Sequence, residues 1–410
     1  MKSKSFCSGW LWVAILCLFA AINAAAAVKP LSEAEGASFG RKIEQEFNGN
    51  DSAYYVQAFD LDAFLDRAFP EQKDLGDQWN EFKRGFQDSY LQTFGKQLRL
   101  IASCKYLSTR QVAGKTRVLL RMLMRNGAVN YHELILIRGQ DGQPRIADVF
   151  LYVTGETMSD TARRAALPAL IDSQKSLLQR IFTTQSDLIT HYQHWRELML
   201  LSGQGRYQQV LNAYADLPAS LQKEKFILVQ QIRASQMLGR PREQLYLQAL
   251  ELWQRTYPDD PSIDLISIDA CLLRKHYDEA LGHVDRLDRA VGGDPYLDVQ
   301  RAFILEMKGD DVKAEAAAKR AIEREPTLLR AYDALLASLV HQHRFAEAVA
   351  LLTKIEKMIG VSRRQLAAIV ENGPLNKDLV RSDEYHQWLL GTSAAQPTPV
   401  AASGEVQTNR

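Results

Sequence analysis

The sequence predicts an α+β domain, with helices packed on an antiparallel sheet, followed by an all-α solenoid of helix pairs. Two observations support this fold class. Between residues 99 and 155, apolar and polar residues alternate with a period of two, which is typical of β-strands. Farther along, alanines recur 34 residues apart at Ala280, Ala314 and Ala348, which is typical of a helical repeat protein.

The chain begins with the pattern of a secretory signal peptide. Lys2 and Lys4 precede an unbroken apolar run from Trp10 to Ile22, and the small residues at 24–27 offer cleavage sites. This run is too short to span a bilayer well, and no later segment is apolar for long enough. We therefore expect residues 1–27 to be removed on export. The mature chain is expected to have no membrane span and to reside in the periplasm if the route is bacterial.

Residues 31–155 are expected to form the α+β domain. Ser32 and Glu35 make a capping box at the start of a helix whose apolar stripe is Phe39, Ile43 and Phe47. Two further helices are predicted at residues 60–69 and 79–98. Strands are predicted at residues 116–124, 128–137 and 145–153, with another at 99–112 and a hairpin signal at Asn126-Gly127.

The helix at residues 79–98 carries a row of aromatic residues: Trp79, Phe82, Phe86, Tyr90 and Phe94. In layout alone, helices followed by an antiparallel meander resemble the NTF2-like cone and the related periplasmic phospholipid-carrier domain. That resemblance implies an apolar pocket for a small molecule or lipid. The same aromatic residues would also fill an ordinary core, which is the more common arrangement.

The 34-residue spacing extends to the residues around each alanine. The positions four and seven residues after the alanines are all apolar: Val284, Ala318, Leu352, Leu287, Ala321 and Ile355. Three residues before the alanine, an aromatic residue stands at Tyr277 and Phe345, whereas the middle copy has Asp311. The repeated apolar face predicts helix pairs that are stable only when stacked.

The copy that starts at Pro295 resembles the tetratricopeptide repeat (TPR) family. It fills five of the family's signature positions in one frame: Ala302, Gly309, Ala314, Ala321 and Pro326. Weaker copies start at Pro261 and Leu329, and two degenerate ones lie upstream. The resemblance implies a solenoid over residues 191–360, in which these five residues together with Ala280 and Ala348 let paired helices pack closely.

Other parts of the chain are assigned around this solenoid. We expect linking helices at residues 156–190 and capping helices at 361–390, since the end of a solenoid needs a polar outer face. The last residues, 391–410, are rich in Ala, Thr, Ser and Pro and are expected to be disordered.

In the TPR family, the first helices of successive repeats line a concave groove that receives extended peptides or partner helices. Carried onto the copies from Pro295 and Leu329, the resemblance implies a partner-binding groove of Tyr296, Val299, Phe303, Glu306, Arg330, Asp333 and His341. Aromatic residues and arginine are common anchors of protein interfaces. The lysine and asparagine set with which some members bind a terminal carboxylate is absent, so the resemblance does not extend to that mode.

Charge and motifs favour a non-enzyme with no cofactor and no metal. Without Lys2 and Lys4, 48 basic residues face 49 acidic ones, a formal charge of −1 that gives no sign of a nucleic-acid partner. His191 and His194 have a spacing that could hold zinc, but no further ligands accompany them convincingly. Neither a phosphate-binding glycine loop nor a nucleophile elbow occurs.

Two carboxylates and two cysteines have ordinary structural explanations. Asp60 and Asp62 stand at a predicted helix start, where capping explains them better than acid–base chemistry. Cys104 and Cys271 are far apart in sequence, and we expect free thiols rather than a disulfide.

Two functions from different classes are consistent with these features. The first is an exported scaffold or adaptor that binds a protein partner in the groove. The second is a carrier or sensor of an apolar small molecule or lipid in the α+β domain. The sequence favours the first.

Overall fold

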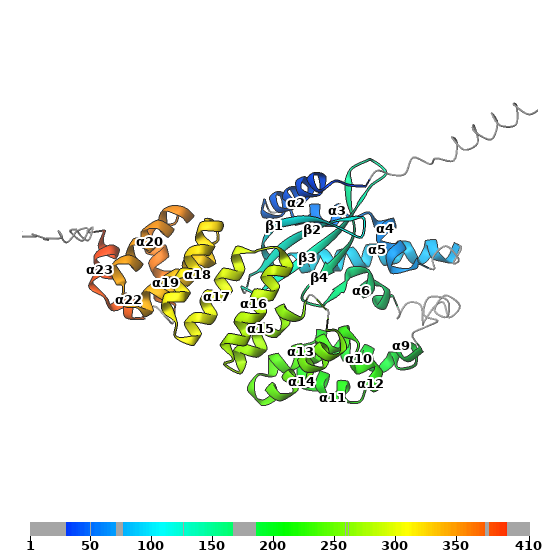
Figure 1. The fold of residues 1–410 in the computed structure, drawn as a ribbon. Helices are drawn as coiled ribbons and strands as arrows, with labels where there is room; N and C mark the ends of the chain where they lie inside the picture. The colour runs from blue at the N-terminus through cyan, green and yellow to red at the C-terminus, as the bar shows by residue number, and fades with distance from the viewer. Residues whose placement is uncertain are drawn as a thin grey trace, which may run out of the picture. The chain divides into compact units, whose positions relative to one another are not determined.

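The computed structural model describes residues 30–49, 51–70, 77–125, 127–166, 186–258, 260, 262–373 and 377–391 (Figure 1). The predicted signal peptide lies outside the described residues, as does the predicted tail apart from Gly391. The chain divides into two units, Met1–Ile263 and Asp264–Arg410. The α+β domain and the first helix hairpins belong to the first unit.

Helices open the α+β domain, as predicted. They are α2 (Glu33–Asn48), α3 (Ser52–Gln57), α4 (Leu61–Ala68) and α5 (Asp77–Leu98). The predicted capping box of Ser32 and Glu35 is confirmed at the start of α2, and the predicted stripe of α2 is buried. Asp60 caps α4 by accepting a hydrogen bond from the backbone N–H of Ala63 at 3.0 Å, which confirms its structural role.

The sheet is an antiparallel meander in the order β1-β2-β3-β4-β5. Its strands are β1 (Ile101–Val112), β2 (Lys115–Met124), β3 (Val129–Arg138), β4 (Pro144–Leu151) and β5 (Glu156–Thr157). The first four strands agree with the predicted ones, and the two-residue β5 is an addition. Ala113 and Gly114 both have positive φ, 48° and 72°, which suits the tight turn between two twisted strands. The predicted fold class is confirmed.

Helix α2 packs on β1 and β2 (Figure 1). Two glycines on its buried face, Gly36 and Gly40, allow this close approach. A Cβ atom at Gly36 would lie 2.7 Å from Thr116, and one at Gly40 would lie 2.5 Å from Tyr106. Glycine is therefore the residue that lets the helix reach the sheet surface.

Among the residues that the structure describes, the first unit continues into two helix hairpins. Its later helices are α6 (Met158–Ala165), α9 (Ser186–Thr190), α10 (Tyr192–Gly203), α11 (Tyr207–Ala215), α12 (Ala219–Gln222), α13 (Lys225–Leu238), the 3₁₀ turn η2 (Arg240–Arg242) and α14 (Glu243–Thr256). Helices α10 and α11 form the first hairpin, and α13 and α14 form the second.

A buried network ties the α+β domain to the second hairpin. The Lys225 ammonium donates to the Gly155 carbonyl at 2.9 Å and lies 2.6 Å from the Asp260 carboxylate. Asp260 also accepts a hydrogen bond from the Trp253 indole at 3.2 Å. Gly155 has a φ of +65°, and a Cβ there would approach Asp260 to 2.7 Å. The sheet domain and the second hairpin are therefore held together by specific contacts as well as by the chain.

The second unit holds three more hairpins and a helical end. They are α15 (Ile263–Leu273), which begins at the boundary residue, with α16 (Tyr277–Val291); α17 (Pro295–Lys308) with α18 (Asp311–Arg324); and α19 (Leu329–His341) with α20 (Phe345–Ile359). The chain then forms α21 (Arg363–Glu371), α22 (Lys377–Arg381) and α23 (Asp383–Leu390).

Four of the five hairpins share one turn geometry. Gly205, Lys275, Gly309 and His343 all have positive φ, between 54° and 85°. In each turn, the residue after the positive-φ position donates its backbone N–H to the carbonyl oxygen of the residue five positions before it. For example, Asp310 donates to Leu305 at 2.9 Å. These bonds form the Schellman motif, which normally carries glycine at the positive-φ position. Backbone geometry therefore repeats even where the sequence has lysine or histidine.

The recurring alanines are buried between the helices. Ala280, Ala314 and Ala348 are each 0% exposed. The residues four positions later are also fully buried, and Ala302 and Ala321 are at most 1% exposed. Small side chains at these positions let the two helices of a pair approach closely. Pro326 is exposed, as expected for a residue that ends a helix.

Candidate functional site

The predicted groove residues separate into buried and exposed ones. Tyr296 is 2% exposed and Val299 is 0% exposed, so neither side chain can meet a partner without rearrangement. The family positions assigned Tyr296 and Val299 to an exposed groove surface, whereas in this chain both side chains are buried. Phe303 is half-buried.

The remaining groove residues come from two successive first helices. Glu306 lies in the last turn of α17, and Arg330, Asp333 and His341 lie on α19 with exposed side chains. Arg330 and Asp333 form an ion pair on one face of α19 at 3.7 Å. Such exposed pairs add little to stability, so both groups are available to a partner.

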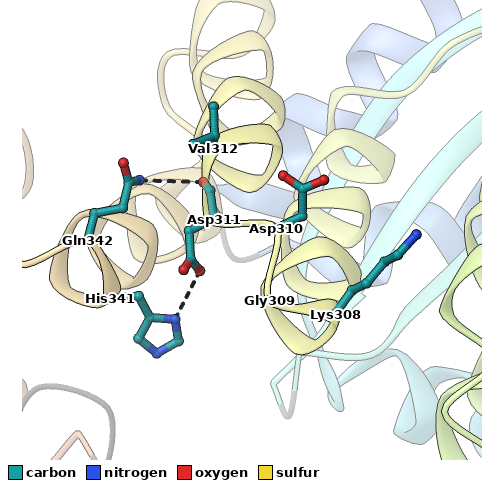
Figure 2. A pocket seen from close by; sticks show the side chains of 7 residues that line it. All are labelled: Lys308, Gly309, Asp310, Asp311, Val312, His341 and Gln342. Carbon is teal, nitrogen blue, oxygen red and sulfur yellow. Dashed lines mark hydrogen bonds and ion pairs between the residues drawn. The ribbon is translucent and has the colours of Figure 1, made fainter.

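A pocket of about 510 Å³ lies where these helices end. It is lined by Lys308, Gly309, Asp310, Asp311, Val312, His341 and Gln342 (Figure 2). The first five residues run from the last residue of α17 through the turn into the start of α18, His341 is the last residue of α19, and Gln342 follows it. The structure thus places the predicted groove residue His341 in a pocket whose other members the sequence did not assign to a partner site.

One residue in the sequence that breaks the repeat pattern indicates this pocket. Asp311 occupies the position that holds Tyr277 and Phe345 in the neighbouring repeats. In the next repeat, the Phe345 ring packs edge-on against His343, with ring centroids 5.7 Å apart. A short carboxylate in place of an aromatic ring leaves space and adds negative charge at this turn.

His341 connects three helices through its two ring nitrogens. Its Nδ1 lies 3.2 Å from Asp311 Oδ1 on α18, and its Nε2 lies 3.8 Å from Glu306 Oε1 on α17 (the first of these is drawn in Figure 2). The Gln342 amide donates to the Asp311 carbonyl oxygen at 3.5 Å. These contacts hold the end of α19 against the turn of the preceding hairpin.

Glu306 is the carboxylate that lies deepest beside this pocket. Its side chain is 9% exposed, and its Oε2 atom has no hydrogen-bond partner within the described part of the chain. Burial raises the pKa of Glu306 above its ordinary value, because the charged form loses hydration, while the nearby His341 acts in the opposite direction.

A neighbouring carboxylate is fully satisfied instead. Burial alone would raise the pKa of Glu315, but hydrogen bonds from Lys319, Gln342 and Arg344 outweigh it and lower the pKa to about 2. The Lys319 and Arg344 cations pair with its two oxygens. Glu315 therefore stabilises the stacking of α18 on the following hairpin and leaves the pocket to other groups.

A second, smaller pocket of about 300 Å³ lies between α10 and α11. Its lining is polar apart from Leu201 and Ala213 and includes His194, Glu197 and Arg206. The His191 and His194 rings lie 5.9 Å apart, but no group of three metal-binding side chains gathers there or elsewhere among the described residues. A polar surface at the first hairpin is what the end of a solenoid requires.

Aromatic rings occupy the described interior of the α+β domain. Tyr55, Phe59 and Phe94 pack with centroids 5.7–6.2 Å apart. The Tyr55 hydroxyl lies 3.0 Å from His132 Nδ1, and burial lowers the pKa of His132 to about 3, so the ring is neutral. The side chains of Phe82, Phe86 and Tyr90 lie outside the described residues.

The two cysteines of the described chain are both free and buried, as expected. Burial raises the pKa of the Cys104 thiol far above its ordinary range, which makes it unreactive. Burial also raises the pKa of Cys271. No helix among the described residues has the length and apolar character of a membrane span.

Comparisons with known proteins concern the fold. The sequence matches no protein-family model, and a search of curated proteins found no match. One similar solved structure is PilW, a type IV pilus biogenesis factor, at 15% identity over 50% of this chain and 91% of that chain, with a TM-score of 0.37. At this identity and TM-score, the similarity says nothing about what this chain binds.

Two further similar structures are named as TPR proteins. TTC0263 from Thermus thermophilus is 19% identical over 44% of this chain and 99% of its own, with a TM-score of 0.32. YrrB, a TPR protein with an unusual peptide-binding site, is 12% identical over 45% of this chain and 96% of its own, with a TM-score of 0.28.

Proposed function

We propose that this chain is an exported, non-enzymatic adaptor that binds a protein partner through the first helices of its helix-hairpin repeats. The observation that carries the proposal is the combination of exposed charged residues on α19, the half-buried Phe303 on α17 and the adjoining pocket at the α17–α18 turn. Aromatic anchors beside a polar rim are typical of protein interfaces. The apolar segment after Lys4 supports export.

In-cell cross-linking followed by affinity capture and mass spectrometry tests this function. We expect the double variant Phe303→Ala and Arg330→Ala to lose the captured partner while its far-UV circular dichroism stays unchanged. A matched control is Ile369→Ala with Arg364→Ala, which removes an exposed apolar residue and an exposed arginine from α21. Undiminished capture by the first variant would falsify the groove assignment.

The competing function is a carrier of an apolar molecule in the α+β domain. Organic-solvent extraction of the purified chain, followed by mass spectrometry, separates the two functions. The adaptor function predicts an empty extract. A stoichiometric lipid in the extract would favour the carrier.

A further inference from the structure

The two outer edges of the sheet differ in how their backbone groups are covered. Strand β1 forms one edge, and β4 with the short β5 forms the other (Figure 1). On the β4 side, Ile146 donates to the Ala58 carbonyl and accepts from the Asp60 N–H, both at 2.9 Å, and β5 pairs with the end of the strand. An uncovered edge strand offers its N–H and C=O groups to other chains, so proteins normally shield it. The β4 edge is shielded in this way.

Helix α2 shields the first half of β1. The Asn48 side-chain amide donates to the Cys104 carbonyl at 2.8 Å and accepts from the Cys104 N–H at 3.0 Å. One turn earlier in α2, the Glu44 carboxylate accepts from the Tyr106 N–H at 3.0 Å. These bonds place the backbone groups of Cys104 and Tyr106 on the side of β1 that faces away from β2.

The second half of β1 has no such cover. Lys105 stands between the two outward-facing residues and therefore faces β2. The pairing register shifts after Tyr106, and Ser108 then lies opposite a β2 residue two positions from the partner of Lys105, so Ser108 also faces β2. Thr109 and Gln111 consequently direct their N–H and C=O groups outward. Within the described part of the chain these outward groups have no hydrogen-bond partner, which makes residues 107–112 an open edge.

The sequence of α2 explains where the cover ends. Residues three or four apart share one face of a helix, so a single stripe beside β1 consists of Asn48, Glu44, Arg41 and Ala37. Arg41 lies over the Tyr106 ring, 5.0 Å from its centroid, and Ala37 has no polar side-chain atom. The residue before it, Gly36, lies against Thr109, since a Cβ there would be 2.8 Å from the threonine methyl. The stripe therefore stops shielding β1 at Thr109.

The open edge carries an excess of positive charge. Residues 105–117 contain four basic residues and no acidic one: Lys105, Arg110, Lys115 and Arg117. Glu44 pairs with Lys105 at 2.9 Å, and Glu133 pairs with both arginines at 3.1 Å and 3.3 Å. Lys115 is exposed, and neither it nor Arg41 forms an ion pair within the described residues. Acidic side chains fit this edge, whereas a second copy of β1 would bring like charges together.

We propose that residues 107–112 of β1 receive an extended, acidic segment of a protein partner, which adds a strand to the sheet. Antiparallel pairing gives the outward groups of Thr109 and Gln111 their missing hydrogen bonds, and the acidic side chains meet the cations of the edge. In this mode of recognition, backbone bonds provide affinity and side chains provide specificity. The surface belongs to the α+β domain, so this inference goes beyond the proposed adaptor function and does not rest on it.

Fluorescence anisotropy with the full chain and three labelled peptides tests the proposal. The first peptide alternates valine with glutamate, and the second has lysine in place of glutamate. The third has the sequence of the first but carries methyl groups on its central backbone nitrogens, which removes their N–H donors. We expect the first peptide alone to bind, with an affinity that falls as the salt concentration rises.

Two pairs of variants test the edge itself. Thr109→Pro removes one outward N–H and spares the pairing with β2, as proline does on edge strands, and should weaken binding about tenfold. Thr109→Val is its control, because it loses the same hydroxyl, which lies 3.0 Å from the Tyr106 hydroxyl, but keeps the N–H. Ala37→Glu should cover the edge as Glu44 does and abolish binding. Ser38→Glu adds the same charge at an exposed position outside the stripe and should leave binding unchanged.

Equal binding of the first and third peptides, or of the two variants in either pair, would overturn the added strand. Equal binding of the lysine peptide would overturn the acidic partner. A dimer in analytical ultracentrifugation that Thr109→Pro dissociates would assign the edge to a second copy and also overturn the proposal. Capture of a partner by the helical repeats is a separate readout, so the adaptor function can stand or fail independently of these results.

Discussion

Replacing Ala314 by leucine is expected to destabilise the second unit strongly. Ala314 is 0% exposed on α18, and its neighbours Ala317, Ala318 and Ala321 are also 0% exposed. These four alanines form the buried face of α18, which packs against α17, so only small side chains separate α18 from its neighbours there. Leucine adds three carbon atoms where no space exists, and overpacking of this kind costs about 1–3 kcal/mol. We expect a loss of about 3 kcal/mol, since the contact lies at the centre of the pair.

Ala316 provides a control in the same helix. It is exposed on α18, two residues from Ala314, and leucine has nearly the helix propensity of alanine. Ala316→Leu should change the free energy of unfolding by less than about 0.5 kcal/mol.

Amide hydrogen exchange read by mass spectrometry on peptides from α17 to α19 is the suitable assay. It reports local opening in these helices separately from the first unit. We expect faster exchange in Ala314→Leu and unchanged exchange in Ala316→Leu. Equal protection in the two variants would refute the close packing of the helix pair.

Three further predictions concern single positions. His343 has a φ of 54° at the position of the Schellman turn that favours glycine, so its backbone is strained. His343→Gly should therefore raise the free energy of unfolding, measured by urea titration, by about 0.5–1 kcal/mol. An unchanged free energy of unfolding would contradict backbone strain at this position. Because the pKa of Glu315 is lowered to about 2, the free energy that its ionised carboxylate contributes to folding is fully present above about pH 5. This contribution is lost as the pH falls toward 2. The stability difference between wild type and Glu315→Gln, about 1–3 kcal/mol at neutral pH, should vanish on acidification, and a constant difference would argue against the ion pairs. Gly155→Ala should cost more than about 2 kcal/mol because of the clash with Asp260, whereas Gly142→Ala, with a φ of +78° and open space, should cost about 1 kcal/mol. Thermal unfolding compares the two glycine variants, and equal decreases in melting temperature would rule out the tight packing of Gly155 against Asp260.

The sequence could predict features that depend on local pattern. The capping box follows from the pair Ser32 and Glu35, and the four long strands and the helix hairpins follow from residue periodicity; the structure contains all of them. The alanine spacing predicted close helix contacts because a stacked repeat places equivalent residues in equivalent surroundings. The repeat spacing also places the positive-φ turn at Lys275, although lysine is not a residue type that favours positive φ.

Other features depend on contacts that local pattern does not report. Tyr296 and Val299 were assigned to an open groove by family position, yet both are buried. The network of Lys225 with Gly155 and Asp260 joins segments far apart in sequence. The pocket at the α17–α18 turn was visible only as the replacement of an aromatic residue by Asp311, whose meaning requires the position of α19.

Site-specific photo-cross-linking in cells tests the central claim most directly. A photoreactive amino acid is placed at Val312, beside the pocket, or at Ile369 on α21; both positions are exposed and apolar, at 70% and 64%. We predict a cross-linked protein partner from position 312 that disappears in Asp311→Asn, and none from position 369. Cross-links of equal yield from the two positions, or cross-links from 369 alone, would contradict a partner-binding surface at the α17–α18 turn.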